Sequence, residues 1–190
     1  MFFRRTLVAM ALVAGAVAPA AADTLDAYLS QETAQFTYLT DSERIGFGGA
    51  DMSLGLFFDD EDDVMLSTGL SVAGVPAGER PLTFGVGAKA YFGFLDEPDQ
   101  DFQSIGLGGE VRYTLPANTP MYLSASAHYA PKVTTFGDAD DFYDLGLRYE
   151  LEVTPGARGF IGYRLMEADL DRGGDYELDD NVHFGVRLDF

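Results

Sequence analysis

The chain has no cysteine, no tryptophan and few basic residues. Without cysteine, neither a disulfide framework nor a thiolate metal site can form. With 12 Lys and Arg against 31 Asp and Glu, the formal net charge is −19. No basic stripe is available to contact phosphates, which argues against nucleic-acid binding.

Long apolar runs are also scarce, and the clearest one lies close to the N-terminus. It extends from Leu7 to Ala18 behind Arg4 and Arg5. A run of about a dozen residues is short for a spanning helix, which needs roughly twenty. The small residues of Ala20–Ala22 suit a signal peptidase. We therefore predict that residues 1–22 are a cleaved secretion signal and that residues 23–190 form one domain.

The rest of the chain is rich in glycine, phenylalanine and tyrosine, and its apolar residues recur at every second position. This period is that of a β-strand with two different faces. In the last segment, Tyr176, Leu178, Val182 and Phe184 are expected on the same apolar face. Eight such strands are predicted, at residues 50–58, 64–72, 82–94, 105–115, 121–129, 143–153, 161–165 and 176–190.

Residues 23–40 predict a further short hairpin. Apolar residues fall at odd positions in 25–29 and at even positions in 34–38, and a strand changes parity only at a turn or bulge. A turn at Gln31–Glu32 would pair Leu29 with Ala34 and Leu25 with Tyr38. This pattern favours ten strands. The alternative is eight strands with a periplasmic N-terminal extension.

The connections between the strands indicate a membrane barrel rather than a soluble one. The strands alone do not decide this, because apolar and polar residues alternate in both kinds of barrel. Tight turns at 116–119 and 154–157 alternate with acidic connections at 59–63, 96–101, 131–141 and 169–175. Short periplasmic turns and longer outer loops are typical of bacterial outer-membrane barrels. We therefore predict an all-β, antiparallel up-and-down transmembrane β-barrel in the outer membrane of a Gram-negative bacterium. In the absence of Trp, Phe and Tyr would form its interfacial girdles.

The polar face of the predicted strands carries charges of both signs among Gly and Ser. A narrow lumen needs small residues beside long ones and opposite charges that compensate each other. We predict a charge network that largely fills the lumen. Its members are Lys89, Glu110, Arg112, Arg148, Glu150, Arg164 and Arg187.

The C-terminal strand ends on Phe184, Val186, Leu188 and Phe190 at two-residue steps. This ending resembles the signal that the outer-membrane barrel-assembly machinery reads. Together with the 23–38 hairpin and the glycine-rich stretch 85–91, it is similar to the YfaZ family of small outer-membrane proteins. The resemblance implies a barrel that contacts outer-membrane lipids, lipopolysaccharide and, during biogenesis, the assembly machinery. It implies no established activity.

Two patterns suggest chemistry, and each has a simpler explanation. Ser126 and His128 share one strand face, as in a membrane-embedded serine hydrolase that acts on lipid, but a polar lumen also needs such residues. Asp169, Asp171 and Asp175 offer oxygen ligands for calcium, but their spacing does not follow an EF-hand and equally suits a solvated loop. We expect no metal or cofactor, and an envelope component without enzymatic activity. A narrow channel and a lipid hydrolase are the alternatives.

Overall fold

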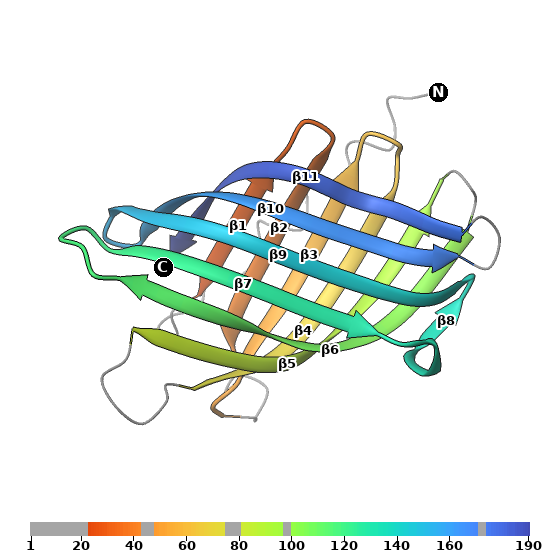
Figure 1. The fold of residues 1–190 in the computed structure, drawn as a ribbon, viewed down its shortest axis with the longest axis horizontal. Coiled ribbons are helices and arrows are strands. Elements are labelled where there is room, and N and C mark those ends of the chain that lie inside the picture. The colour runs from red at the N-terminus through yellow and green to blue at the C-terminus, as the bar shows by residue number, and fades with distance from the viewer. Residues whose placement is uncertain (1–22, 43–47, 75–80, 97–99, 171–173) are drawn as a thin grey trace.

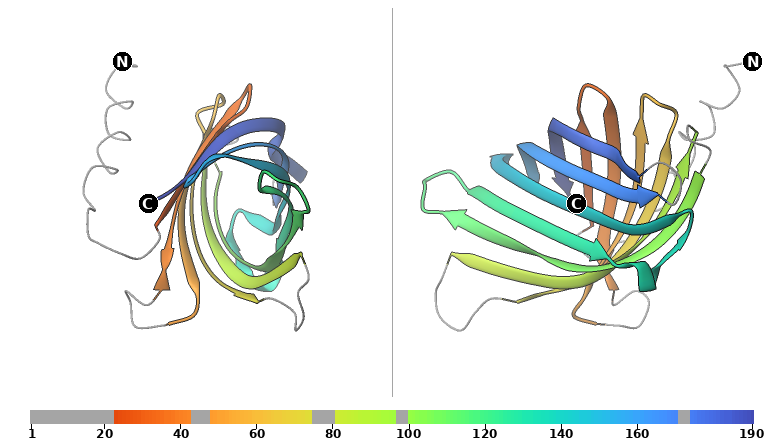
Figure 2. Two further views of the ribbon diagram at one scale, coloured as in Figure 1. Left: turned by 90° about the vertical axis from the view of Figure 1, so that its left-hand side faces the viewer. Right: turned by 45° about the vertical axis from the view of Figure 1, so that its right-hand side comes forward.

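The computed structural model describes residues 23–42, 48–74, 81–96, 100–170 and 174–190, and they form a closed barrel (Figures 1 and 2). Ten antiparallel strands make the ring, each paired with its neighbours, and β1 pairs with β11 to close it. These strands are β1 (Thr24–Leu29), β2 (Thr33–Asp41), β3 (Asp51–Asp59), β4 (Val64–Gly74), β5 (Leu82–Leu95), β6 (Gln100–Leu115), β7 (Met121–Ala130), β9 (Ala139–Thr154), β10 (Ala157–Leu170) and β11 (Gly174–Asp189). The ten-strand prediction is confirmed, and the eight-strand alternative is wrong because β1 and β2 belong to the ring.

The N-terminal hairpin has the register that its parity predicts. Leu29 lies opposite Ala34, and Leu25 lies opposite Tyr38. The turn is held by the Ser30 hydroxyl, which accepts a hydrogen bond of 2.8 Å from the Thr33 amide. Because β1 of this hairpin pairs with β11, the hairpin closes the ring.

The large apolar side chains on the alternating face point out of the barrel. Val86, Leu107 and Phe184 are 67%, 69% and 64% exposed, and comparable residues occur on every wall. Such a surface is stable only in an apolar surrounding. Among the described residues, none of the helices has the length and apolar character needed to span a membrane.

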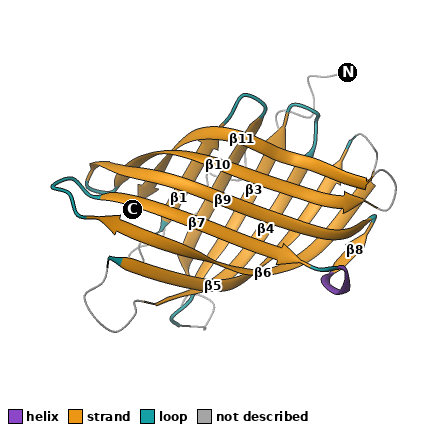
Figure 3. Cartoon of the chain, viewed as in Figure 1, coloured by secondary structure: helices purple, strands orange, loops and turns teal. Residues whose placement is uncertain are grey.

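The antiparallel order brings like connections to the same end of the barrel (Figure 1). The strand ends that flank the acidic connections lie together at one end, here called the acidic end, and the turns at 116–119 and 154–157 lie at the other, the short-turn end. Strands β6, β9 and β10 extend further toward the acidic end than the alternation in the sequence predicts. Segment 131–141 is also folded there: it contains a 3-10 turn, η4 (Lys132–Thr134), and a short strand, β8 (Thr135–Gly137), paired with β6 (Figure 3).

A β-bulge in β11 overturns one prediction. Opposite the bulge, Met166 of β10 pairs with Asp179 but the next residue, Glu167, pairs with Glu177, so Leu178 is an extra residue. The bulge reverses the parity of the strand beyond it. Tyr176 and Leu178, predicted on the outer apolar face, instead pack inside, with Leu178 only 4% exposed, while Glu177 is exposed.

Candidate functional site

The barrel interior contains two regions of different chemistry. The region toward the acidic end is apolar, and we call it the apolar core. Three aromatic rings form its centre, with Phe142 at 4.6 Å from Tyr91 and 5.4 Å from Phe102 between centroids. Its buried members are Phe57, Met65, Tyr91, Leu95, Phe102, Ala130, Ala139, Phe142, Met166, Ala168, Leu170 and Leu178.

Glycine makes room for this packing. A Cβ atom at Gly93 would lie 2.6 Å from Cζ of Phe102, which is too close for any side chain. Gly93 on β5 therefore lets the Phe102 ring of β6 lie directly beside its backbone. At this point the smallest residue lies beside one of the largest, and the core is therefore closely packed.

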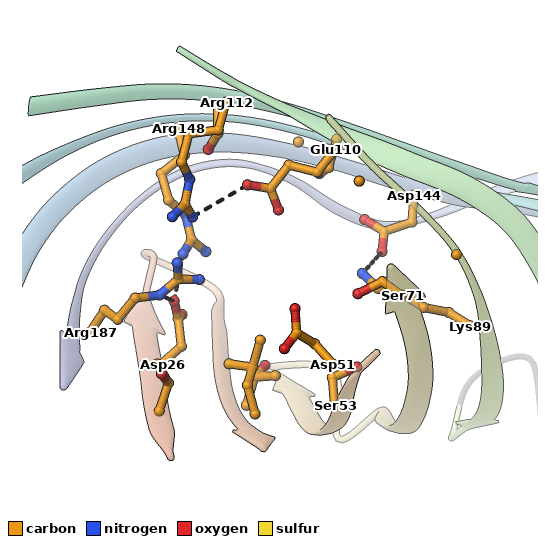
Figure 4. A pocket seen from close by; sticks show the side chains of 18 of the residues that line it. Asp26, Asp51, Ser53, Ser71, Lys89, Glu110, Arg112, Asp144, Arg148 and Arg187 are labelled. Atoms are coloured by element: carbon orange, nitrogen blue, oxygen red, sulfur yellow. Dashed lines mark hydrogen bonds and ion pairs between the residues drawn. The ribbon is translucent and has the colours of Figure 1, made fainter. Parts of the chain in front are cut away.

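The region toward the short-turn end holds a cavity of about 470 Å³, here called the chamber (Figure 4). It extends from the level of Tyr28 and His128 to the strand ends at Thr24, Thr40 and Thr83. Its lining is mostly charged residues, hydroxyls and glycines. Every residue of the predicted charge network lines it.

Glu150 on β9 is the centre of one group of charges. It is fully buried, and its carboxylate oxygens lie 3.3 Å from Arg158, 3.5 Å from Arg187, 3.6 Å from Arg112 and 3.9 Å from Arg148. Four cations around one carboxylate offset its desolvation cost. Arg148 also stacks on the Phe160 ring, at 3.8 Å from the centroid.

Asp26 on β1 connects these arginines across the closing seam. Its Oδ2 accepts a hydrogen bond of 2.6 Å from Arg148 and one of 2.9 Å from Arg187. The sequence analysis missed Asp26, although its place between Leu25 and Ala27 puts it on the polar face of the hairpin. Arg158 has a partner of its own, because it donates a 2.6 Å hydrogen bond to Asp189.

A second group centres on Asp144. Arg164 donates to both of its oxygens, with Nε 2.9 Å from Oδ1 and Nη2 3.0 Å from Oδ2, and the Tyr91 hydroxyl donates to Oδ2 at 2.9 Å. Lys89 lies further away, at 3.8 Å from Oδ2. Glu110 is more peripheral, at 3.3 Å from Arg112 with 44% of its side chain exposed.

Ser126 and His128 both face the interior from β7. Within the described part of the chain, no hydrogen bond joins them. Asp144 lies opposite His128 in the register, but Arg164 and Tyr91 already occupy its oxygens. The geometry therefore does not assemble the Ser–His–carboxylate relay that a hydrolase needs.

The acidic residues considered for calcium are only partly described. Asp169 and Asp175 lie opposite each other on β10 and β11, while Asp171 falls outside the described residues. The described ranges contain no group of three or more His, Cys, Asp or Glu residues arranged to hold a metal ion.

The C-terminal residues considered as an assembly signal lie in one outward row along the end of β11 and the residue that follows it. Phe184, Val186, Leu188 and Phe190 are 64%, 52%, 42% and 66% exposed. The Phe190 amide donates to the Asp23 carbonyl, and the Asp23 amide donates to the Phe190 carbonyl, both at 2.9 Å. The row therefore follows the seam at which the barrel closes.

An antiparallel barrel with an apolar outer surface and charged residues inside defines an outer-membrane β-barrel protein. The chain belongs to the YfaZ family, because the model of that family, described as YfaZ precursor, matches residues 5–190. This confirms the resemblance seen in the sequence.

Among solved structures, the chain is similar to the outer membrane channel DcaP of Acinetobacter baumannii, with 12% identity and a TM-score of 0.38. The match covers 87% of this chain and 54% of that one, so the chain spans about half the length of DcaP. No curated protein matches the chain.

Proposed function

We propose that this protein is a closed, non-enzymatic component of the outer membrane, with a chamber that opens only toward the short-turn end. The apolar core is the observation that carries the proposal. Phe57, Phe102 and Phe142 are each 1% exposed inside the ring of strands. Ion and solute pathways need polar groups and water along their whole length, and a packed apolar layer interrupts such a pathway.

The proposed orientation places the acidic end outside the cell and the short-turn end in the periplasm. Residues 1–22 then act as the export signal, although they lie outside the described residues. The apolar outer face contacts membrane lipids, and the acidic end lies at the level of lipopolysaccharide. Proteolysis of intact cells tests the orientation: cleavage within the 131–141 segment supports it, and cleavage only after the outer membrane is opened contradicts it.

Conductance in a planar bilayer tests the closed lumen. Refolded residues 23–190 should show no steady single-channel current. Replacing both Phe102 and Phe142 with Ala should produce a current, because the replacement removes two of the three rings at the centre of the apolar core. Phe184→Ala is the control, since it removes a ring from the outer face. A large, stable current through the unmodified protein would overturn the proposal.

We also propose that the outward row at 184–190 is recognised by the assembly machinery. Replacing Phe190 with Ser should lower the amount of folded barrel in the outer membrane and leave the protein in the periplasm. Val133→Ser is a matched control, because Val133 is also exposed but lies in η4 at the acidic end. Equal outer-membrane levels of the Phe190→Ser variant and the unmodified protein contradict this role.

A further inference from the structure

The chamber gathers basic residues within a strongly acidic chain. Six of the 12 Lys and Arg residues line it, but only five of the 31 Asp and Glu residues do. The basic residues are Lys89, Arg112, Arg148, Arg158, Arg164 and Arg187. The acidic residues are Asp26, Asp51, Glu110, Asp144 and Glu150. The lining is therefore close to neutral, whereas the rest of the molecule is strongly acidic and repels anions.

Lys89 is the one basic residue of this group that lacks a close partner among the described residues. Each of the five arginines has a carboxylate oxygen within 3.3 Å. The Lys89 ammonium lies 3.8 Å from Asp144, which is longer than a hydrogen bond, and 33% of its side chain is exposed. Its three N–H donors are therefore available to another group.

The wall beside Lys89 is made of small and hydroxyl residues. Cγ of Lys89 lies 2.8 Å from the place where a Cβ of Gly69 would be, and the Ser53 hydroxyl lies 2.7 Å from it. Gly69 therefore leaves room for the lysine stem to cross β4. Ser71 is two residues further along that strand on the same face, and it lies close to Lys89 in the chamber (Figure 4).

A buried imidazole lines another wall of the chamber. His128 on β7 lines the chamber and is only 7% exposed, and its Nδ1 atom has no hydrogen-bond partner in the protein. Buried polar atoms are normally paired. This nitrogen is itself closed to solvent, so a ligand in the chamber would meet the other ring nitrogen, Nε2.

We propose that the chamber binds a small free oxyanion, a phosphate or carboxylate, with Lys89 supplying the charge and Ser71 and His128 supplying hydrogen bonds. A volume of about 470 Å³ is suitable for a small molecule. The charged lining does not suit an acyl chain, so the ligand is a soluble anion rather than a lipid. The site does not depend on whether the barrel conducts.

Isothermal titration of the refolded chain in detergent, at constant ionic strength set with chloride, tests this site with inorganic phosphate and with succinate. At least one of the two should bind saturably to a single site. Lys89→Met should weaken that binding about tenfold or more, because it removes a charge-assisted hydrogen bond, whereas Lys89→Arg should retain most of it. Lys132→Met, at a 75% exposed lysine of the acidic end, is the matched control and should change nothing.

A second variant covers the case in which Lys89→Met does not fold. Ser71→Asp places a fixed carboxylate beside Lys89 and should abolish binding while leaving the barrel intact. Short-chain phosphatidylglycerol, which carries the phosphate on a lipid, should not compete with the free anion. Absence of saturable binding by the unmodified protein, unchanged affinity in both variants, or competition by the lipid would each overturn the proposal.

Discussion

Near the acidic end the barrel is filled by Phe, Tyr, Met and Leu, whereas near the short-turn end Arg, Asp and Glu project into a cavity. The same ring of strands lines both regions, and β11 changes its inward parity between them at the bulge. The apolar core gains stability from packing and excludes water. The chamber needs paired charges and still leaves space. This difference is the basis of both proposals, that the acidic end closes the barrel and that the short-turn end receives a ligand.

The largest effect is expected in the apolar core. Phe142→Ala should lower the free energy of unfolding by about 3–5 kcal/mol, because it opens a cavity beside Tyr91 and Phe102. Urea unfolding of the refolded barrel, followed by its gel mobility without boiling, measures this change. Phe184→Ala serves as the control on the outer face. Equal losses in the two variants would mean that the core contributes no more to stability than the outer face does.

In the chamber, Glu150→Gln should cost about 2–3 kcal/mol, because four guanidinium groups lose the carboxylate that they share. Glu110→Gln, at a position that is 44% exposed, should cost less than about 1 kcal/mol. The same unfolding experiment compares the two variants. A loss for Glu110→Gln as large as that for Glu150→Gln would contradict the central position of Glu150.

The smallest effect concerns the bulge in β11. The inward-facing Tyr176 hydroxyl donates to Asp63 at 2.7 Å and to Glu61 at 2.9 Å. Tyr176→Phe should therefore cost about 1 kcal/mol. If Tyr176 instead faced lipid, as unbroken alternation predicts, Phe would be tolerated or even favoured, and the unfolding midpoint would not fall.

Alternation in the sequence was sufficient to predict the class of fold, the ten strands and the hairpin register, because each depends on neighbouring residues. It could not predict the bulge at Leu178, which arises from the pairing of β10 with β11. Nor could it pair Arg187 with Asp26, which are distant in sequence and meet only when the ring closes. The apolar core did leave a signal, since Phe57, Tyr91 and Phe102 occupy positions of inward parity, but a uniformly polar lumen was expected.

The proposal that the apolar core closes the barrel is tested most directly by the accessibility of the chamber from each side of a membrane. The chain has no cysteine, so Ser71→Cys introduces a single thiol into the chamber. The variant is inserted into liposomes, its orientation is determined by proteolysis of the acidic end, and a charged methanethiosulfonate is added to one side at a time. We predict modification only from the short-turn side. Equal modification from the acidic side would contradict the account, because the reagent would have passed through the apolar core.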